Sequence, residues 1–371
     1  MLSNLSLNQF RSYESLELSF SEGFNVLTGL NGTGKTNVLD AIHFIAFTKG
    51  FRSSNDKQSV REGCDFFMLK AEAVSEKKTL EIQCNFTKAQ GKRVLTNNKV
   101  VEKLSSHIGT VPLVTSLPGD TMLITDSAAE RRRFLDMLIA QYDASYLQHL
   151  ILYNRILQQR NALLRQFNEQ RNFDPELLSV WDQQLIPHGL AIYKARAIFT
   201  RDFAPLFTRF FHRIVSEKET PTIAYRSQVK ENSEQGWMDL LTDFYTRDRA
   251  NLYTGCGIHR DDLTFKINDA SARHYGSQGQ QKTFVIALRL AQYQLLQEQT
   301  QQAPILLLDD LFEKLDEKRL GELAEVLDKD IPGQIFITDT SRERLQHLLQ
   351  NTADKETRFF DVTPGEVAQV D

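Results

Sequence analysis

The chain has 371 residues, of which 41% are hydrophobic and 25% charged, and its formal net charge is −4. This composition excludes a disordered or collagen-like protein and leaves room for two or three folded domains. Residues 1–4 do not lead into an apolar segment and no apolar run could span a bilayer, so we expect neither a signal peptide nor a membrane partner. Cys64, Cys84 and Cys256 lack the spacing of a zinc or disulfide framework, which favours a cytoplasmic protein.

The first motif in the chain is a glycine-rich loop between an expected strand at 24–27 and an expected helix at 37–47. Glycines let successive backbone N–H groups turn around phosphates, and the start of the helix adds its positive end. In such a P-loop, Lys35 is expected to bind the β- and γ-phosphates of ATP and Thr36 to bind Mg²⁺. The nucleotide contacts expected here are Gly29, Leu30, Asn31, Gly32, Thr33, Gly34, Lys35, Thr36 and Asn37.

Residues 60–115 have the pattern of an antiparallel β-layer. Apolar side chains at 80, 82, 84 and 86 alternate with polar ones, which is the two-residue period of a half-buried strand. Residues 89–92 and 96–99 are rich in turn-forming residues and flank a short strand. We therefore expect hairpins in this region.

The middle of the chain is predicted to be a helical lobe. No Gly or Pro occurs from Ala128 to Phe167, and apolar residues recur there at helical spacing. A second helical stretch follows Asp174-Pro175, with an interruption expected at Pro187, and helical character continues to about Arg249. A helix of this length reaches about 60 Å at 1.5 Å per residue, which is too short for the coiled-coil arm of an SMC protein.

The last third contains two further motifs. Ser277-Gln278-Gly279-Gln280 stands at the start of a long expected helix, where small residues at a helix N-terminus suit a γ-phosphate. The alternative for Ser277 is a plain helix N-cap. The apolar strand Ile305–Leu308 ends in Asp309 and Asp310, expected to reach Mg²⁺ and to orient the attacking water, respectively.

About 270 residues separate the P-loop from this acidic strand, which is far more than an ordinary connection. The P-loop sheet must therefore be built from both ends of the chain, as in ABC-type ATPases with a large insertion. We expect residues 1–119 to form the N-terminal part of the ATPase domain, 120–249 the helical lobe, and 250–371 the C-terminal part of the ATPase domain.

Six segments in this order resemble the RecF family of ABC/SMC-type ATPase heads, and the resemblance covers nearly the whole chain. The resemblance implies an α/β P-loop NTPase of the ABC/SMC/Rad50-head type, with an antiparallel β-layer, an inserted helical lobe and no long coiled coil. It also adds Arg11 to the nucleotide contacts. The segments are Phe10-Arg11-Ser12-Tyr13, residues 31–37, Phe51-Arg52-Ser53, residues 131–136, His259-Arg260-Asp261-Asp262-Leu263 and residues 277–282.

The resemblance further implies a function. The chain would be an ATP- and Mg²⁺-dependent DNA-binding protein of recombinational repair, replication and the SOS response, with weak, DNA-stimulated ATPase activity. It would bind duplex DNA near single-strand gaps as a homodimer that holds ATP between the P-loop of one subunit and the signature of the other. RecO and RecR would be its partners in loading the recombinase.

The chain departs from the usual family pattern at a few positions. Ile258 precedes His259 where the family usually has Pro, and Gly119 stands where an acidic residue is usual. Glu313-Lys314 replaces the more usual Ser-Glu in the loop after the acidic strand. After the next strand, residues 338–340 read Thr-Asp-Thr where ABC transporters carry a histidine.

The negative net charge requires any DNA-binding surface to be a local cluster of Lys and Arg. Arg131, Arg132 and Arg133 cannot all face one partner, because neighbouring positions of a helix are about 100° apart. For Arg155, Arg160 and Arg165 a solvated helix surface is the favoured alternative to DNA contact. A polar core residue is as good an interpretation of His259 as a nucleotide-sensing one.

Two other functions fit parts of the pattern. An ATPase subunit of a Rad50-like nuclease complex would need a partner nuclease or a second acidic metal cluster. A transporter ATPase would lack the helical lobe and the Arg-Arg-Arg and His-Arg-Asp-Asp segments. Stimulation of ATP hydrolysis by DNA or by a membrane partner would separate these functions.

Overall fold

A computed structural model describes residues 1–53, 55–75, 78–215, 219–230, 232–275, 278–311, 317–350 and 355–370. The chain divides into two compact units. Unit 1 contains Met1–Thr121, Arg209–Lys218 and Ser277–Asp371, and unit 2 contains Met122–Thr208 and Glu219–Gly276. Residues 250–276 thus lie in unit 2, not with the C-terminal ATPase segment, because β10 (Asp262–Ile267) pairs with β9 (Pro221–Arg226).

A mainly parallel sheet forms the centre of unit 1, in the order β15-β14-β3-β13-β12-β8. Its parallel strands are β3 (Phe24–Thr28), β8 (Leu113–Ser116), β12 (Ile305–Leu308), β13 (Ile335–Asp339) and β14 (Thr357–Thr363), and β15 (Glu366–Val370) pairs antiparallel at the edge. Every residue of β3, β12 and β13 is buried, as expected for strands covered on both faces. The expected contribution of both chain ends to this sheet is confirmed.

An antiparallel sheet forms the second layer of unit 1, in the order β2-β1-β4-β5-β6-β7. The alternation at residues 80–86 correctly predicted β5. The layer also includes β1 and β2, which lie before the region expected from the sequence. Its strands are β1 (Leu2–Phe10), β2 (Tyr13–Ser19), β4 (Phe66–Ser75), β5 (Lys78–Thr87), β6 (Gly91–Thr96) and β7 (Lys99–Val100).

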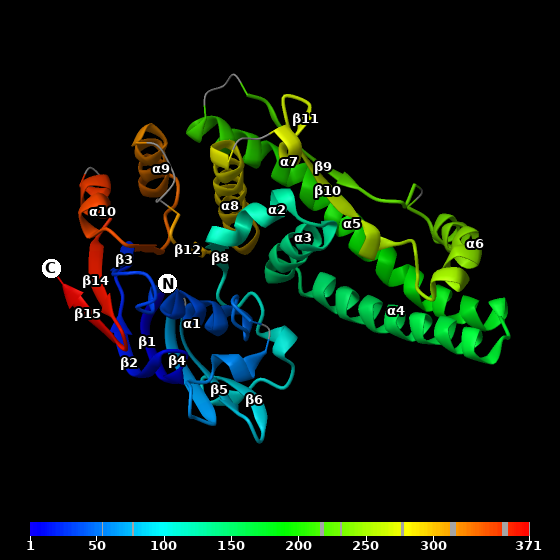
Figure 1. Ribbon diagram of the computed structural model, residues 1–371, viewed down its shortest axis with the longest axis horizontal. Helices are drawn as coiled ribbons and strands as arrows, with labels where there is room; N and C mark the ends of the chain where they lie inside the picture. Colours follow the sequence, from blue (N-terminus) through cyan, green and yellow to red (C-terminus); the bar gives the residue numbers. More distant parts are fainter. Residues whose placement is uncertain are drawn as a thin grey trace. The chain divides into compact units, whose positions relative to one another are not determined.

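Helix α1 (Lys35–Phe47) packs against strands of both sheets, including β4 and β13 (Figure 1). Its apolar residues are buried on nearly all sides, so α1 links the two layers and fixes the start of the P-loop helix. Three more helices, α8 (Gln278–Thr300), α9 (Glu317–Lys329) and α10 (Arg342–Leu349), belong to unit 1, and α8 contacts β8. Short 3₁₀ helices occur at Asp56–Ser59, Leu104–Ser106 and Pro118–Thr121.

Unit 2 is built from helices and a small antiparallel sheet, β11-β10-β9. Its main helices are α3 (Ala128–Tyr142), α4 (Ala144–Gln170), α5 (Pro175–Ile214), which continues into unit 1, and α6 (Glu234–Asn251). The smaller elements are α2 (Met122–Thr125), β11 (Ala270–Ser271), α7 (Ala272–Tyr275) and a 3₁₀ helix at Ile258–Arg260.

Three details of the predicted lobe are wrong. The helical stretch from Ala128 is broken at Asp143, whose carboxylate accepts from the backbone N–H of Tyr146 and caps α4. In contrast, α5 passes through Pro187 and Pro205 without ending, although each proline lacks an N–H donor. The strand β9 also lies in a region predicted as helical.

Candidate nucleotide site

The P-loop joins the end of β3 to the start of α1, as the sequence predicts. Gly29, Gly32 and Gly34 have φ values of 155°, 83° and 120°, in the region that other residues rarely adopt. Space restricts two of them as well: a Cβ would lie 2.3 Å from the carbonyl oxygen of Val362 at Gly29, and 2.5 Å from the hydroxyl of Tyr13 at Gly34. These glycines are therefore required both by conformation and by close packing.

Lys35 lies across the loop that it follows. Its Nζ donates to the carbonyl oxygens of Gly29 at 2.7 Å and Leu30 at 3.0 Å, and the side chain is buried. The hydroxyl of Thr33 also donates to the carbonyl of Leu30, at 2.9 Å. The ammonium group is thus held inside the turn of the loop, which is where the P-loop interpretation requires positive charge.

Asp309 connects three segments of the site. Its Oδ1 accepts from the hydroxyl of Thr36 at 3.0 Å and from that of Thr338 at 2.7 Å. The contacts arise because β12 lies beside β13 and β13 beside β3, so the carboxyl ends of these parallel strands meet. Burial raises the pKa of Asp309, while the two hydroxyl groups counteract this shift.

Asp310 follows Asp309 in a left-handed conformation, with φ of 45°. Its backbone N–H donates to the hydroxyl of Thr338 at 3.0 Å. Thr338 therefore contacts both acidic residues at once and fixes the turn at the end of β12. A non-glycine residue at positive φ is uncommon, and such strain often marks functional sites.

The Thr36–Asp309 pair fits a Mg²⁺ ion. Mg²⁺ prefers oxygen ligands and usually binds through one or two carboxylates together with phosphate oxygens. A buried carboxylate beside a threonine hydroxyl, next to the phosphate-binding loop, provides this donor set. Within the described ranges, no cluster of three or more His, Cys, Asp or Glu side chains is placed to hold a metal.

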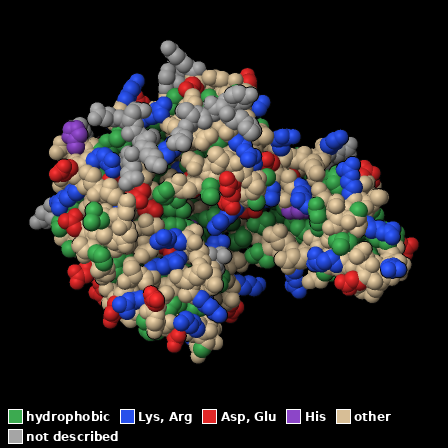
Figure 2. Space-filling view, viewed as in Figure 1, with side chains coloured by type: hydrophobic (Ala, Val, Ile, Leu, Met, Phe, Trp, Pro, Cys, Tyr) green, Lys and Arg blue, Asp and Glu red, His purple; other side chains and the backbone are tan. Residues whose placement is uncertain are grey.

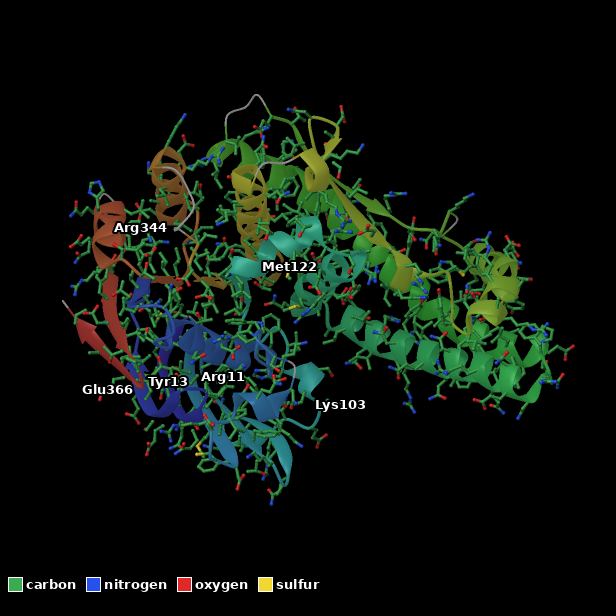
Figure 3. All side chains as sticks on the ribbon, in the orientation of Figure 1. Arg11, Tyr13, Lys103, Met122, Arg344 and Glu366 are labelled. Carbon is green, nitrogen blue, oxygen red and sulfur yellow. The ribbon has the colours of Figure 1, made fainter. Side chains whose placement is uncertain are left out.

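A second cluster lies around Asp40, in the second turn of α1. Arg11 donates from Nε and Nη2 to Oδ2 of Asp40, at 3.0 and 2.8 Å, and from Nη1 to the carbonyl of Gln58. Asp40 is buried and its Oδ1 accepts from the backbone N–H of Phe51. Arg11 thus joins α1 to the segment that follows it, and Figure 3 shows Arg11 and Tyr13 on neighbouring parts of this region.

Asn37 is held between two of the family-like segments. Its Nδ2 donates to the hydroxyl of Ser12 at 2.8 Å, and its Oδ1 accepts from Arg52 at 3.0 Å. Phe10–Tyr13 and Phe51–Ser53 resemble segments of the family, but the sequence alone does not explain why the two lie apart in the chain. The structure supplies an explanation, since both segments contact α1 beside the P-loop. Asp40 and Ser12 were not predicted as site residues.

The signature is only partly described. Ser277 lies outside the described residues, as do Glu313 and Lys314 of the acidic-strand loop. Helix α8 begins at Gln278, and the hydroxyl of Thr283 donates to the carbonyl of Gly279 at 2.9 Å. Gln280 lies in the first turn of this helix. The roles predicted for these four signature residues stay predictions.

The side chains of Arg131, Arg132 and Arg133 differ in burial, as helical spacing predicts. Arg131 is buried and pairs with Asp262, with distances of 2.6 and 3.1 Å from Nε and Nη2. Arg132 is half-buried and donates to the carbonyl of Asp261 at 2.7 Å, and Arg133 is exposed.

Other basic residues of unit 2 also differ in exposure. Arg160 is fully buried between Asp182 and Asp248, at 2.6 and 2.7 Å, which excludes a direct contact with DNA there. Arg155 and Arg165 are exposed.

Both ring nitrogens of His259 have hydrogen-bond partners within unit 2. Its Nε2 lies 2.9 Å from the carbonyl of Thr254, and its Nδ1 lies 3.0 Å from the hydroxyl of Tyr153. The carbonyl can only accept, so Nε2 carries the proton and Nδ1 accepts from Tyr153. Burial, together with the charges of neighbouring arginines, lowers the pKa of His259 to about 4, although the hydrogen bond to Thr254 acts in the opposite direction. The ring is therefore neutral at pH 7, which favours the polar core interpretation over a charged sensor.

Comparisons with known proteins identify relatives of almost the whole chain. Residues 1–357 match the model of the RecF/RecN/SMC N terminal domain. The DNA replication and repair protein RecF of Flavobacterium johnsoniae is 39% identical over 351 residues, which cover 95% of this chain and 97% of that protein. The RecF protein of Azobacteroides pseudotrichonymphae is 41% identical over 366 residues, covering 99% and 98%.

Solved structures show the same relationship. The recombination mediator protein RecF with ATP, described as part of the RecFOR pathway, has a TM-score of 0.89 and 27% identity, and the match covers 100% of this chain and 97% of that one. An Smc head bound to the C-winged helix domain of ScpA has a TM-score of 0.59 at 16% identity over 100% and 96% of the two chains, which shows the fold alone.

These matches confirm the expected ABC/SMC-type head fold, with its antiparallel layer and helical insertion. Among the described residues, no helix combines the length and apolar character needed to cross a membrane. The chain belongs to the RecF family of the RecF/RecN/SMC group.

Proposed function

We propose that this chain is an ATP-dependent DNA-binding protein of recombinational repair and replication, and that ATP controls its binding to DNA. The observation that supports this most directly is the contact of Asp309 with both Thr36 and Thr338, beside a P-loop with Lys35 inside its turn. The names of the similar RecF proteins supply the process, DNA replication and repair.

The nucleotide site follows from the chemistry of its residues. Lys35 and the backbone N–H groups of residues 29–36 bind the phosphates of ATP, and Asn37 and Arg11 support this loop from the side. Thr36 and Asp309 hold Mg²⁺, which neutralises charge on the phosphates when it is bound. Asp310 orients the attacking water. Hydrolysis is slow, because Asp is one methylene shorter than the Glu common in ABC proteins. The resemblance to the RecF family supports stimulation of this hydrolysis by DNA.

The second half of each site comes from another copy of the chain. Ser277, Gln278, Gly279 and Gln280 contact the γ-phosphate held by the P-loop of the partner, so ATP lies in the interface of a homodimer. The dimer binds duplex DNA near single-strand gaps in the cytoplasm and, with RecO and RecR, helps to load the recombinase. The RecFOR pathway of a solved RecF relative supports these partners.

A combined measurement of hydrolysis and mass tests this function. ATP hydrolysis is measured with and without gapped duplex DNA, and sedimentation with and without a non-hydrolysable ATP analogue. We expect stimulation by DNA and an analogue-dependent shift from monomer to dimer. Lys35→Ala is expected to lose ATP binding, the dimer and ATP-dependent DNA binding together.

Hydrolysis that is unchanged by DNA, together with a mass that is unchanged by nucleotide, would refute the proposal. No specific observation favours the nuclease-complex or transporter alternatives. Unchanged nucleotide affinity in Lys35→Ala would refute the assignment of the P-loop itself.

A further inference from the structure

The segment His259–Asp262 of unit 2 contains two acidic residues, and buried arginines use both. Asp262 is paired with Arg131, at 2.6 and 3.1 Å. Asp261 is buried, lies 3.3 Å from Nη1 of Arg196 and accepts from the hydroxyl of Tyr225. Each of these carboxylates thus already pairs with a buried arginine.

Arg132 and Arg260 donate hydrogen bonds to backbone carbonyls, and the carboxylates that act on the charge of Arg132 are those of Asp262, Asp136 and Asp261. Arg132 donates to the carbonyl of Asp261 at 2.7 Å, and Arg260 donates to that of Thr254 at 3.3 Å. Arg260 is exposed and lies over the ring of Tyr253, with 4.9 Å from Cζ to the ring centroid. Tyr253 is itself 44% exposed. Stacking of this kind fixes the plane of a guanidinium and leaves N–H donors at its edge.

Arg247 belongs to the same surface. It is exposed and lies over the ring of Phe244 at 5.4 Å. That ring packs against Gly255, where a Cβ would lie 3.0 Å from Cδ1 of Phe244, and Gly255 adjoins the carbonyl that Arg260 contacts. Figure 2 shows Lys and Arg side chains gathered over the end of unit 2 that carries α4 and α6.

An exposed acid, Asp243, lies one helical turn before Arg247 on α6. Asp248 is the only acidic residue between positions 243 and 261, and it is buried against Arg160 at 2.7 Å. The helix dipole favours Arg247 near the end of α6, but it explains neither Arg132 in the first half of α3 nor Arg260 in a 3₁₀ turn. Arg132 has Asp136 one helical turn away on α3, so helix stability leaves only Arg260 without an explanation.

Buried contacts hold the turn that carries Arg260. The ring of His259 bridges the carbonyl of Thr254 and the hydroxyl of Tyr153. Gly257 has φ of 116°, and a Cβ there would lie 2.6 Å from the Tyr153 hydroxyl, so this close approach requires glycine. A surface fixed in this way loses little conformational entropy when it binds a ligand.

We propose that Arg132, Arg247, Arg260 and Tyr253, here called the arginine patch, bind the phosphodiester backbone of DNA. This inference rests on the proposed function and names the surface through which unit 2 would take part. Guanidinium groups match phosphate geometry, and an exposed ring beside them can stack on an unpaired base at a gap. An acidic protein surface matches the patch less well than DNA does, because the ring of Tyr253 between the charges can stack on a base.

The test compares two charge-removing pairs in the full chain. Arg132→Gln/Arg260→Gln removes two charges from the patch, and the control Arg155→Gln/Arg165→Gln removes two exposed charges from α4. Fluorescence anisotropy with a labelled gapped duplex, in the presence of a non-hydrolysable ATP analogue, gives affinity over a range of salt concentrations. ATP binding is measured in the same preparations to show that the P-loop is intact.

For the patch pair we expect affinity about tenfold to a hundredfold weaker, and a salt slope smaller by about 1.8, since each lost phosphate contact removes about 0.9. We expect the control pair to stay within about twofold of the parent. Among the described residues Arg247 makes a ring contact but no hydrogen bond, so Arg247→Gln tests the patch without disturbing the fold, with a slope smaller by about 0.9.

Each other outcome overturns the inference in a distinct way. If Arg132→Gln/Arg260→Gln and Arg247→Gln both keep the DNA affinity and salt slope of the parent, the patch does not bind DNA. The proposed function would be unaffected by that result. Unchanged DNA affinity with lost binding to RecR would assign the patch to a protein partner instead. A parent protein that does not bind DNA with the ATP analogue would refute the proposed function as well.

Discussion

The Asp309 carboxylate receives hydrogen bonds from threonines that lie about 300 residues apart in the chain. Thr36 comes from the start of α1, and Thr338 from the end of β13. Thr338 also accepts from the backbone N–H of Asp310, which holds this residue at positive φ. A single hydroxyl thus sets the positions of both acids relative to the P-loop.

Asp310→Asn tests the water-orienting role of Asp310. Removal of its charge is expected to lower ATP hydrolysis by roughly a hundredfold or more, since the amide cannot accept a proton from water. ATP binding is expected to be retained, because Lys35 and the P-loop are unchanged. Single-turnover hydrolysis and nucleotide binding measure the two effects, with the exposed Asp243→Asn as control. Hydrolysis at the parental rate would move the role to another residue.

Much of the nucleotide site could be predicted from the sequence, because its core is a local motif. The positions of glycines, Lys35 and Thr36 are set by spacing within eight residues. Asp309 required the additional assumption that its strand lies beside the P-loop strand; β13 in fact lies between β12 and β3, yet Asp309 still contacts Thr36. The partners of Arg11 could not be predicted, because the position of Asp40 in the helical run gives no sign of which side chain it pairs with.

Among the elements, the helices of unit 2 are joined by buried charges as well as by apolar packing. Arg160 on α4 reaches Asp182 on α5 and Asp248 on α6, and all three side chains are buried. Arg160 also donates to the hydroxyl of Thr254 at 2.8 Å. The removal of one partner from such a group leaves buried charge without compensation.

Arg160→Ala is expected to destabilise unit 2 by about 3–5 kcal/mol, because Asp182 and Asp248 lose their shared cation. Urea unfolding followed by tryptophan fluorescence measures this change, since both tryptophans, Trp181 and Trp237, lie in unit 2. The exposed Arg165→Ala serves as the matched control and should change stability by less than about 0.5 kcal/mol. A loss below about 1 kcal/mol in Arg160→Ala would contradict a compensating role.

The half-buried ring of His259 makes unit 2 sensitive to acid. Burial lowers the pKa of His259 to about 4 in the folded chain, against 6.5 in its unperturbed form. Between these pH values the unfolded state binds more protons, so stability falls as pH decreases from 6.5 towards 4. Between pH 7 and pH 5 the parent is expected to lose about 2 kcal/mol more than His259→Gln.

The same urea titration at the two pH values checks this difference. The comparison with His259→Gln removes the contribution of carboxylates, which titrate in both proteins. Equal losses of stability in the two proteins would show that the ring takes up a proton without cost, and that its hydrogen bonds to Thr254 and Tyr153 do not fix its charge state.

The sequence predicts where helices occur more reliably than where they begin and end. Apolar periodicity identified α3 and α4 but not the break at Asp143, because a capping aspartate looks like a surface residue within a helix. Pro187 was expected to interrupt α5, yet tertiary packing outweighs one missing hydrogen bond in a helix of 40 residues. The strand β9 was missed because its partner, β10, lies far along the chain.

At the scale of the whole molecule, the separation of motifs in the sequence predicted how the central sheet is built. β3 comes from the N-terminal segment, and β12, β13 and β14 come from the last seventy or so residues. The position of the boundary between units could not be predicted, because residues 250–276 read as turn-rich α/β sequence while β10 joins them to unit 2. Long-range strand pairing leaves no local signal.

ATP-dependent formation of the proposed dimer depends on the signature Ser277-Gln278-Gly279-Gln280 at the start of α8. A helix N-terminus favours an anion, and small residues there let the backbone approach a phosphate closely. In the proposed dimer this helix faces the ATP of the other subunit. Ser277→Arg is expected to fill that space and block ATP-dependent dimerisation, while each monomer still binds ATP through its own P-loop.

Sedimentation with a non-hydrolysable ATP analogue measures the mass of the parent, of Ser277→Arg and of a matched control, the exposed Ser145→Arg in unit 2. The parent and the control should form dimers, and Ser277→Arg should remain a monomer with normal ATP affinity. A mixture of Ser277→Arg and Lys35→Ala should restore at most one of the two nucleotide sites, because each variant keeps the half-site that the other lacks. If Ser277→Arg dimerises as readily as the parent, the signature acts within its own chain, and ATP cannot be what joins the two subunits.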